Sequence, residues 1–174
     1  AMFQDALVFN QKIGKWDLAS VTDLRAMFNG SREFNQDIGD WNTSKVTAMS
    51  SMFQNAVNFN QDIGSWNTSS VTDMEFMFSG ASSFNQPIND WDVSKVSKMN
   101  NMFQYTKLFN QDLSDWDVRS VDNFRYMFAN SQYNQKIIGW NMESAIYMGG
   151  MFMLNKVFNS ELNFKNTSNV IEMS

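Results

Sequence analysis

Large apolar residues return along the chain at a fixed interval of 25 positions. Tryptophan forms the clearest column, at Trp16, Trp41, Trp66, Trp91, Trp116 and, one position early, Trp140. Phenylalanine forms a second column at Phe3, Phe28, Phe53, Phe78, Phe103, Phe128 and Phe152. Further apolar columns begin at Phe9, Ile13, Val21 and Leu24, and each continues through seven units. A period in this range indicates a repeat protein in which neighbouring units share one continuous core.

Within one repeat, the spacing of apolar positions predicts two short elements. Residues 71–78 place Val71, Met74 and Met77 three apart, which is the spacing of one face of a short helix or helical turn. Residues 59–66 are expected to be extended, with Ile63 as the central inward residue of a short strand. Polar turns join the two elements. Strands stacked in register at about 4.8 Å would all pair in parallel.

The sequence therefore predicts a repeat solenoid with one short parallel strand and one short helical turn in each 25-residue coil. A parallel β-helix is the alternative fold. Residues 1–174 are expected to form a single solenoid domain of seven repeats, one of them a residue short. Neither end has an atypical capping unit, so we expect a segment of a longer array, or ends that stack against other copies.

The unit Phe-Asn-Gln-Asp-Ile-Gly-x-Trp-Asn-Thr-Ser-x-Val-Thr-x-Met-x-x-Met-Phe resembles a repeat of about 25 residues in bacterial surface proteins, known from mycoplasma and Listeria lipoproteins as a domain of unknown function. It is also similar to the leucine-rich repeat of the BspA type. The matching positions are Phe59, Ile63, Val71, Met74, Met77, Phe78, Ala81 and Phe84. The resemblance covers the whole chain and implies a leucine-rich-repeat-like solenoid on a cell surface, used for adhesion or protein binding. It implies no catalytic residue, and the chain departs from it by using Phe, Met and Trp where Leu is usual.

Composition limits the chemistry that these columns can carry. The chain has no His and no Cys, which excludes the usual zinc ligands, thiol chemistry, disulfides and histidine-based catalysis. With 13 Lys and Arg against 18 Asp and Glu, the net charge of −5 provides no basic surface for nucleic acid. No apolar run approaches the roughly 20 residues of a membrane span. We expect no cofactor, and we expect protein or glycan partners at a cell surface.

An asparagine follows the second phenylalanine column in every repeat. The column is Asn10, Asn35, Asn60, Asn85, Asn110, Asn134 and Asn159. A repeated amide beside a buried ring is typical of an asparagine ladder, in which stacked side chains satisfy buried backbone groups. Ligand binding is the other interpretation. The adjacent glutamines, from Gln11 to Gln135, are either a second ladder or a solvent-facing row. The tryptophans are expected in the core or at its edge, with an exposed aromatic stripe as the alternative.

Six aspartates are expected on the exposed side of the predicted strands and form a candidate acidic patch. They are Asp37, Asp40, Asp62, Asp90, Asp112 and Asp115. Like charges stacked in register repel each other, so bound Ca²⁺ or a basic partner could compensate them. The alternative is a solvated face that keeps strands from pairing laterally. Because no Asp-x-Asp-x-Asp spacing occurs within one coil, we expect no metal site.

Exposed positions depart from the repeat most often in the later units. A candidate variable patch for a partner consists of Tyr105, Lys107, Arg119, Arg125 and Tyr126. Further departures in these units are Asn123, Tyr133, Ile138 and Tyr147. Divergence toward one end of an array would give the same pattern without a partner.

These features predict a non-enzymatic binding or adhesion module, on a cell surface or secreted, that contacts protein or glycan. A structural element that assembles end to end into fibres is the alternative. An enzyme of the parallel β-helix type is disfavoured, because every acidic residue belongs to a repeated column and none forms a unique pair. An ice-binding surface is disfavoured because the threonine column that starts at Thr22 breaks at Ser97 and Asp122.

Overall fold

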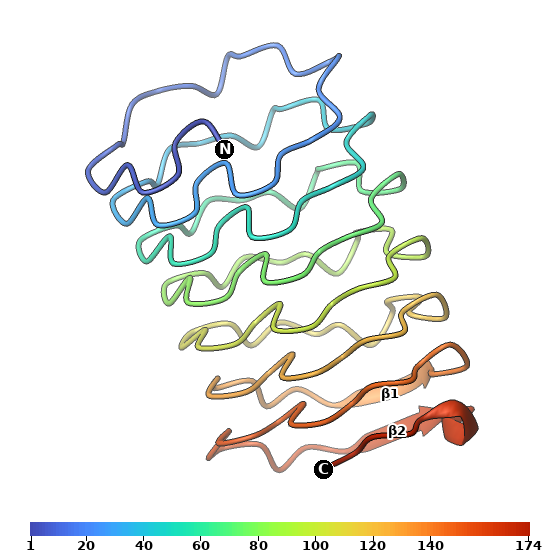
Figure 1. Ribbon diagram of the computed structural model, residues 1–174. Helices are drawn as coiled ribbons and strands as arrows, with labels where there is room; N and C mark the ends of the chain where they lie inside the picture. The colour runs from blue at the N-terminus through green and yellow to red at the C-terminus, as the bar shows by residue number, and fades with distance from the viewer.

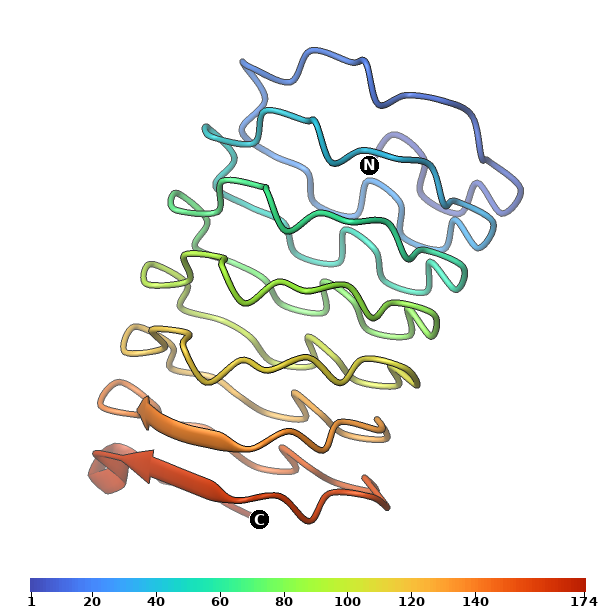
Figure 2. The same cartoon turned by 180° about the vertical axis from the view of Figure 1, so that it is seen from behind.

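The computed structural model describes all 174 residues and shows a chain wound into a stack of similar coils (Figure 1). The N-terminus lies in the coils at one end of the stack and the C-terminus at the other, as the view from behind also shows (Figure 2). Backbone hydrogen bonds join each coil to the next. Phe53 N–H donates to the oxygen of Met77 at 2.9 Å, and Phe78 N–H donates to the oxygen of Met102 at 3.0 Å. The step from coil to coil therefore follows the repeat in the sequence.

Regular secondary structure is confined to the C-terminal coils. It consists of strand β1 (Ile137–Asn141), strand β2 (Leu162–Lys165) and the 3-10 turn η1 (Thr167–Asn169). The strands pair in parallel, with Ile137 opposite Leu162. Elsewhere, parallel pairing is reduced to isolated bridges along the column Asp23, Ala48, Asp73, Lys98, Asn123, Tyr147 and Glu172. The structure contains no helix of the length and hydrophobicity that a membrane crossing requires.

Residues 59–66, expected to be a strand, do not form one in the structure. Side chains take up the backbone donors of this segment. The N–H of Asn60 donates to Oδ1 of Asn35 at 2.9 Å, and the N–H of Gly64 donates to Oδ1 of Asp62 at 2.9 Å. Because these donors are occupied, no continuous backbone ladder forms here, and the equivalent positions are regular strands only in β1 and β2.

Residues 71–78, expected to form a short helix or helical turn, form no helix in the structure. The backbone follows consecutive tight turns whose N–H groups alternate between two directions. The N–H of Met77 returns to the oxygen of Met74 at 3.2 Å, whereas the N–H of Phe78 reaches Met102 in the next coil. Phe76 has a φ of 56°, which is left-handed and incompatible with a right-handed helical path.

One hydrophobic core of 44 buried residues runs through the stack. The rings of Phe28, Phe53 and Phe78 follow one another at centroid distances of 5.7 and 5.6 Å and are nearly parallel. Within one coil, Phe78 also stacks on Phe84 at 4.1 Å. Offset stacking of this kind adds to the energy of burying the rings. Each coil therefore covers the rings of its neighbour, which no single coil could bury alone.

Five of the six tryptophans are buried, as expected, and Trp16 is 39% exposed. Their indole N–H groups donate to the backbone oxygen of the isoleucine column one coil earlier. Trp66 bonds to Ile38 in this way at 3.1 Å. The polar atom of the indole is thus satisfied inside the core.

Candidate functional site

The asparagine column lies between coils and bonds to the backbone of the next coil. Oδ1 of Asn35 accepts the N–H of Asn60 at 2.9 Å, and Oδ1 of Asn60 accepts the N–H of Asn85 at 2.9 Å. Gln61 Nε2 donates to both oxygens of Asn35 at 3.0 Å, so the glutamines share the same network. The column ends where Oδ1 of Asn134 accepts the backbone N–H of Asn159 at 2.8 Å. These amide oxygens are occupied by the protein itself.

The candidate acidic patch lies on the surface, and all six of its aspartates are exposed. Asp37 and Asp62 each accept the backbone N–H two residues further on, at 3.0 and 2.9 Å. Asp112 accepts the N–H of Ser114 at 2.9 Å, and hydrogen bonds from Ser114 hold the pKa of Asp112 below its usual value. No three acidic side chains in the structure gather in a way that could hold a metal ion. Three members of the patch thus have a local role in turns.

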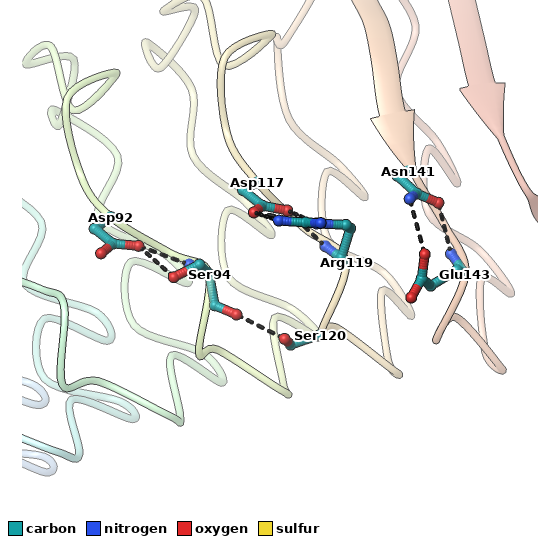
Figure 3. A network of polar contacts seen from close by, with 7 residues as sticks. All are labelled: Asp92, Ser94, Asp117, Arg119, Ser120, Asn141 and Glu143. Carbon is teal, nitrogen blue, oxygen red and sulfur yellow. Dashed lines mark hydrogen bonds and ion pairs between the residues drawn. The ribbon is translucent and has the colours of Figure 1, made fainter.

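A second polar row lies at the corner turn that follows each tryptophan (Figure 3). Oδ1 of Asp92 accepts the N–H of Ser94 at 3.0 Å and its hydroxyl at 2.6 Å. Oδ2 of Asp117 pairs with Nη2 of Arg119 at 2.6 Å. In the following coil, Oδ1 of Asn141 accepts the backbone N–H of Glu143 at 3.2 Å. Hydrogen bonds from Ser94 lower the pKa of Asp92, and those from Arg119 lower the pKa of Asp117. Asn and Asp fill the same place with the same bond, so the row serves the turn.

The structure places the members of the candidate variable patch on two kinds of turn. Arg119 lies at the corner turn drawn in Figure 3, where its guanidinium donates to the carboxylate of Asp117. Tyr105, Arg125 and Tyr126 lie in the runs of tight turns of adjacent coils, where the N–H of Tyr105 donates to the oxygen of Ala129 at 3.0 Å. Tyr105 is 52% exposed, and Lys107 is exposed as well. Tyr133, another departure from the repeat, is fully buried and offers nothing to a partner.

Arg125 lies in a group of side chains that spans three coils and has no counterpart elsewhere in the repeat. The centre of its guanidinium lies 4.1 Å from the centroid of the Tyr147 ring. The same guanidinium forms an ion pair with Glu172, 47 residues further on, and this pairing raises the pKa of Arg125. Oδ1 of Asn123 accepts the backbone N–H of Arg125 at 3.1 Å and fixes the start of the turn.

Two consecutive glycines provide the space for this group. A Cβ atom on Gly149 would overlap the carboxylate of Glu172, and one on Gly150 would overlap the ring of Tyr126. Gly150 also has a φ of 63°, which glycine adopts without strain. We name Arg125, Tyr126, Tyr147, Gly149, Gly150 and Glu172 the Arg125 cluster. Sequence reasoning missed the two glycines and Glu172, and a Gly-Gly pair where earlier repeats carry side chains was the available signal.

Each end of the stack carries an apolar depression. The one at the N-terminal end has a volume of about 1020 Å³ and is lined by residues that include Trp16, Val21 and Met27. The one at the C-terminal end has a volume of about 430 Å³, and its lining includes Met151 and Phe164. Between internal coils, the next coil covers the equivalent apolar columns.

Sequence and structure together define a repeat protein whose coils share one core and whose polar rows mostly serve its own turns. A family described as a Mycoplasma protein of unknown function, DUF285, matches residues 1–106 and 85–174. The two matches overlap and together span the whole chain, so the chain belongs to this family. No curated protein and no solved structure shows a significant match to it.

Proposed function

We propose that the chain is a non-enzymatic binding and adhesion module, in the form of a leucine-rich-repeat-like solenoid of the BspA type. It acts on a cell surface or after secretion, and its partners are proteins or glycans. The repeated polar rows are occupied by hydrogen bonds to their own turns and coils, as the bonds of Asn60 and Asp92 illustrate. The side chains left for a partner are therefore those that depart from the repeat.

The exposure of two tyrosines at unfavourable backbone positions carries this proposal. Tyr105 has a φ of 60° and is 52% exposed, and Tyr126 has a φ of 56° and is 37% exposed. Other coils have the same left-handed φ at these places, with Asn55 and Gly80 in the column of Tyr105 and Ser51 and Gly150 in the column of Tyr126, so the exposed ring is what distinguishes the two tyrosines. A side chain in this conformation costs roughly 1–2 kcal/mol. Because the two rings lie partly in solvent, their burial offsets only part of this cost. Tyrosine and arginine are the residue types enriched at the centres of protein interfaces.

Surface plasmon resonance on the immobilised protein tests the proposal against panels of extracellular proteins and glycans. A double variant, Tyr105→Ser with Tyr126→Ser, is measured in parallel. We expect at least one ligand whose affinity falls by about tenfold or more in the double variant. Val8→Ser is the matched control, because Val8 is 84% exposed and lies in the first coil. A failure of every ligand in the panels, or equal binding by the double variant, contradicts the proposal.

End-to-end assembly is the second candidate function, and the apolar depressions at both ends favour it. A heterologous contact between opposite ends does not close on itself and builds a filament. Light scattering over a concentration series tests this function, with growth into elongated oligomers as the expected result. Val21→Asp, within the N-terminal depression, should stop the growth. A monomer at every concentration contradicts assembly.

A further inference from the structure

We infer that the Arg125 cluster is a docking site for an acidic segment of a partner protein, whose carboxylate takes the place that Glu172 holds in the structure. The inference rests on the proposed binding function and gives the chemistry of its partner. Three observations carry it: the geometry of Arg125, the exposure of the Glu172 side chain and the two glycines beside the pair.

Arg125 has the geometry of a carboxylate receptor. Its guanidinium lies over the ring of Tyr147 at 4.1 Å and pairs with the carboxylate of Glu172. The two paired side chains are 38% and 32% exposed, so solvent reaches both. A planar guanidinium backed by an aromatic ring presents its N–H groups to a carboxylate in a fixed orientation. Glu172 thus shows the class of ligand that this arrangement accepts.

Glu172 lies in a thinly packed part of the stack. No residue after Met151 is buried, and the neighbours Ile171 and Met173 are 75% and 64% exposed. Ion pairs between partly exposed groups contribute little to folding. The backbone of Glu172 is held by its bridge to Tyr147 and by the N–H of Met148, which donates to its oxygen at 2.9 Å. Its side chain is partly exposed and can turn away, so that another carboxylate takes its place at Arg125.

The two glycines leave room that side chains of the cluster fill, and the carboxylate of Glu172 occupies the place over Gly149 that a partner's carboxylate would take. Gly149 and Gly150 carry no side chain across the coil that separates Arg125 from Glu172. The ring of Tyr126 lies against Gly150 and remains 37% exposed. A docking segment would therefore meet a cation and an aromatic surface in the same place, which is the composition of an interface hot spot.

The charge around Arg125 is mixed, and the whole protein carries a net charge of −5. Lys98 is exposed and bridges to Asn123, two residues before Arg125. Lys98 also bridges to Asp73, and Asp122 precedes Asn123, so carboxylates lie on this side of the stack as well. The negative charge of the remaining protein opposes binding of an acidic chain elsewhere, so an acidic probe reports selectively on this site.

Fluorescence anisotropy with a labelled peptide of alternating Glu and Ala tests the inference, with a Lys-Ala peptide of the same length as the probe control. Arg125→Gln should weaken binding of the Glu-Ala peptide by about tenfold or more. Glu172→Gln should strengthen it several-fold, because it removes the competing carboxylate. Arg25→Gln is the matched control, since Arg25 occupies the same repeat position and pairs with Asp23 at 2.6 Å. It should leave binding unchanged.

Opposite responses of the two cluster variants are the decisive result. Arg125→Gln and Glu172→Gln remove the same intramolecular ion pair, so a purely structural role would make both variants change binding in the same direction. Thermal melting of each variant verifies that it is folded. Equal affinity of Arg125→Gln and the parent, or weaker binding by Glu172→Gln, overturns the inference. A ligand from the panels that depends on Tyr105 but not on Arg125 would leave the proposed function standing without this site.

Discussion

The indole nitrogen of Trp91 donates a hydrogen bond of 3.1 Å to the backbone oxygen of Ile63 in the preceding coil. The other four buried tryptophans make the same bond at 2.9–3.1 Å. Each of these residues fills the core with its rings while its one polar atom bonds to the neighbouring coil. A column that is apolar by composition thereby also fixes the register between coils.

Replacing Trp91 by Phe should lower the free energy of unfolding by about 1–3 kcal/mol. The variant loses the hydrogen bond to Ile63 and leaves a cavity where the larger ring system packed. Urea unfolding followed by circular dichroism measures the change. Trp16→Phe is the control, because Trp16 is 39% exposed, and its effect should remain below about 0.5 kcal/mol. Equal losses in the two variants would contradict a role for the interior bond.

The asparagine ladder makes a prediction that depends on one atom. Oδ1 of Asn60 accepts the N–H of Asn85 at 2.9 Å and Nε2 of Gln86 at 3.1 Å. Asn60→Ala removes this acceptor from both donors and should lower the free energy of unfolding by about 1–3 kcal/mol. Asn60→Asp keeps an oxygen in the same place and should lose less than half as much. If the two variants are equally unstable in urea, the acceptor is not what the column supplies.

The stacked arrangement of the columns could be predicted because the same residue types occupy them in nearly every unit. The elements within a coil could not. The spacing of Val71, Met74 and Met77 suits a helix and a series of tight turns equally well. The choice between them depends on donors such as Phe78 N–H, which bonds to Met102 in the next coil. A pattern within one repeat carries no information about such a partner.

The candidate site shows the same limit. Arg125 and Tyr126 stand out in the sequence because they depart from the repeat, but the partner of Arg125 lies 47 residues away at Glu172. Arg119 stands out equally, and its side chain bonds to Asp117 at a corner turn. Departure from a repeat therefore identifies candidates without showing which of them lie together.

Tyr133 provides a test of burial. It takes the place of Phe109 in the column, is fully buried, and its hydroxyl has no hydrogen-bond partner. Burial is the main cause of its raised pKa, followed by the charge of Asp112. Because an unpaired buried hydroxyl is unfavourable, Tyr133→Phe should raise the free energy of unfolding by about 1 kcal/mol. Tyr105→Phe, at an exposed site, should change it little. A loss of stability on Tyr133→Phe would mean that the hydroxyl makes a favourable interaction.

The corner turn at Asp92 makes the protein sensitive to acid. Hydrogen bonds from Ser94 hold the pKa of Asp92 below the 3.8 of a free carboxyl, so the charged form stabilises the fold above that pH. This contribution is lost as the pH falls through the lower, folded-state value. Asp92→Asn keeps the turn, as Asn67 does with Ser69. Its unfolding free energy should therefore lie slightly below that of the parent at neutral pH, because the amide lacks the charge, and should fall less steeply on acidification from about pH 5 to about pH 2.

Urea unfolding at a series of pH values measures this difference, and Asp92→Ala is the control for the turn itself. Alanine provides no acceptor for either hydrogen bond of Ser94, so this variant should be less stable at neutral pH by about 0.5–1.5 kcal/mol. It should also share the flatter acid response of Asp92→Asn, because neither variant has a carboxylate to protonate at this position. An Asp92→Asn variant that loses stability in acid as steeply as the parent would place the acid sensitivity in other carboxylates, such as Asp117, whose pKa is lowered by Arg119.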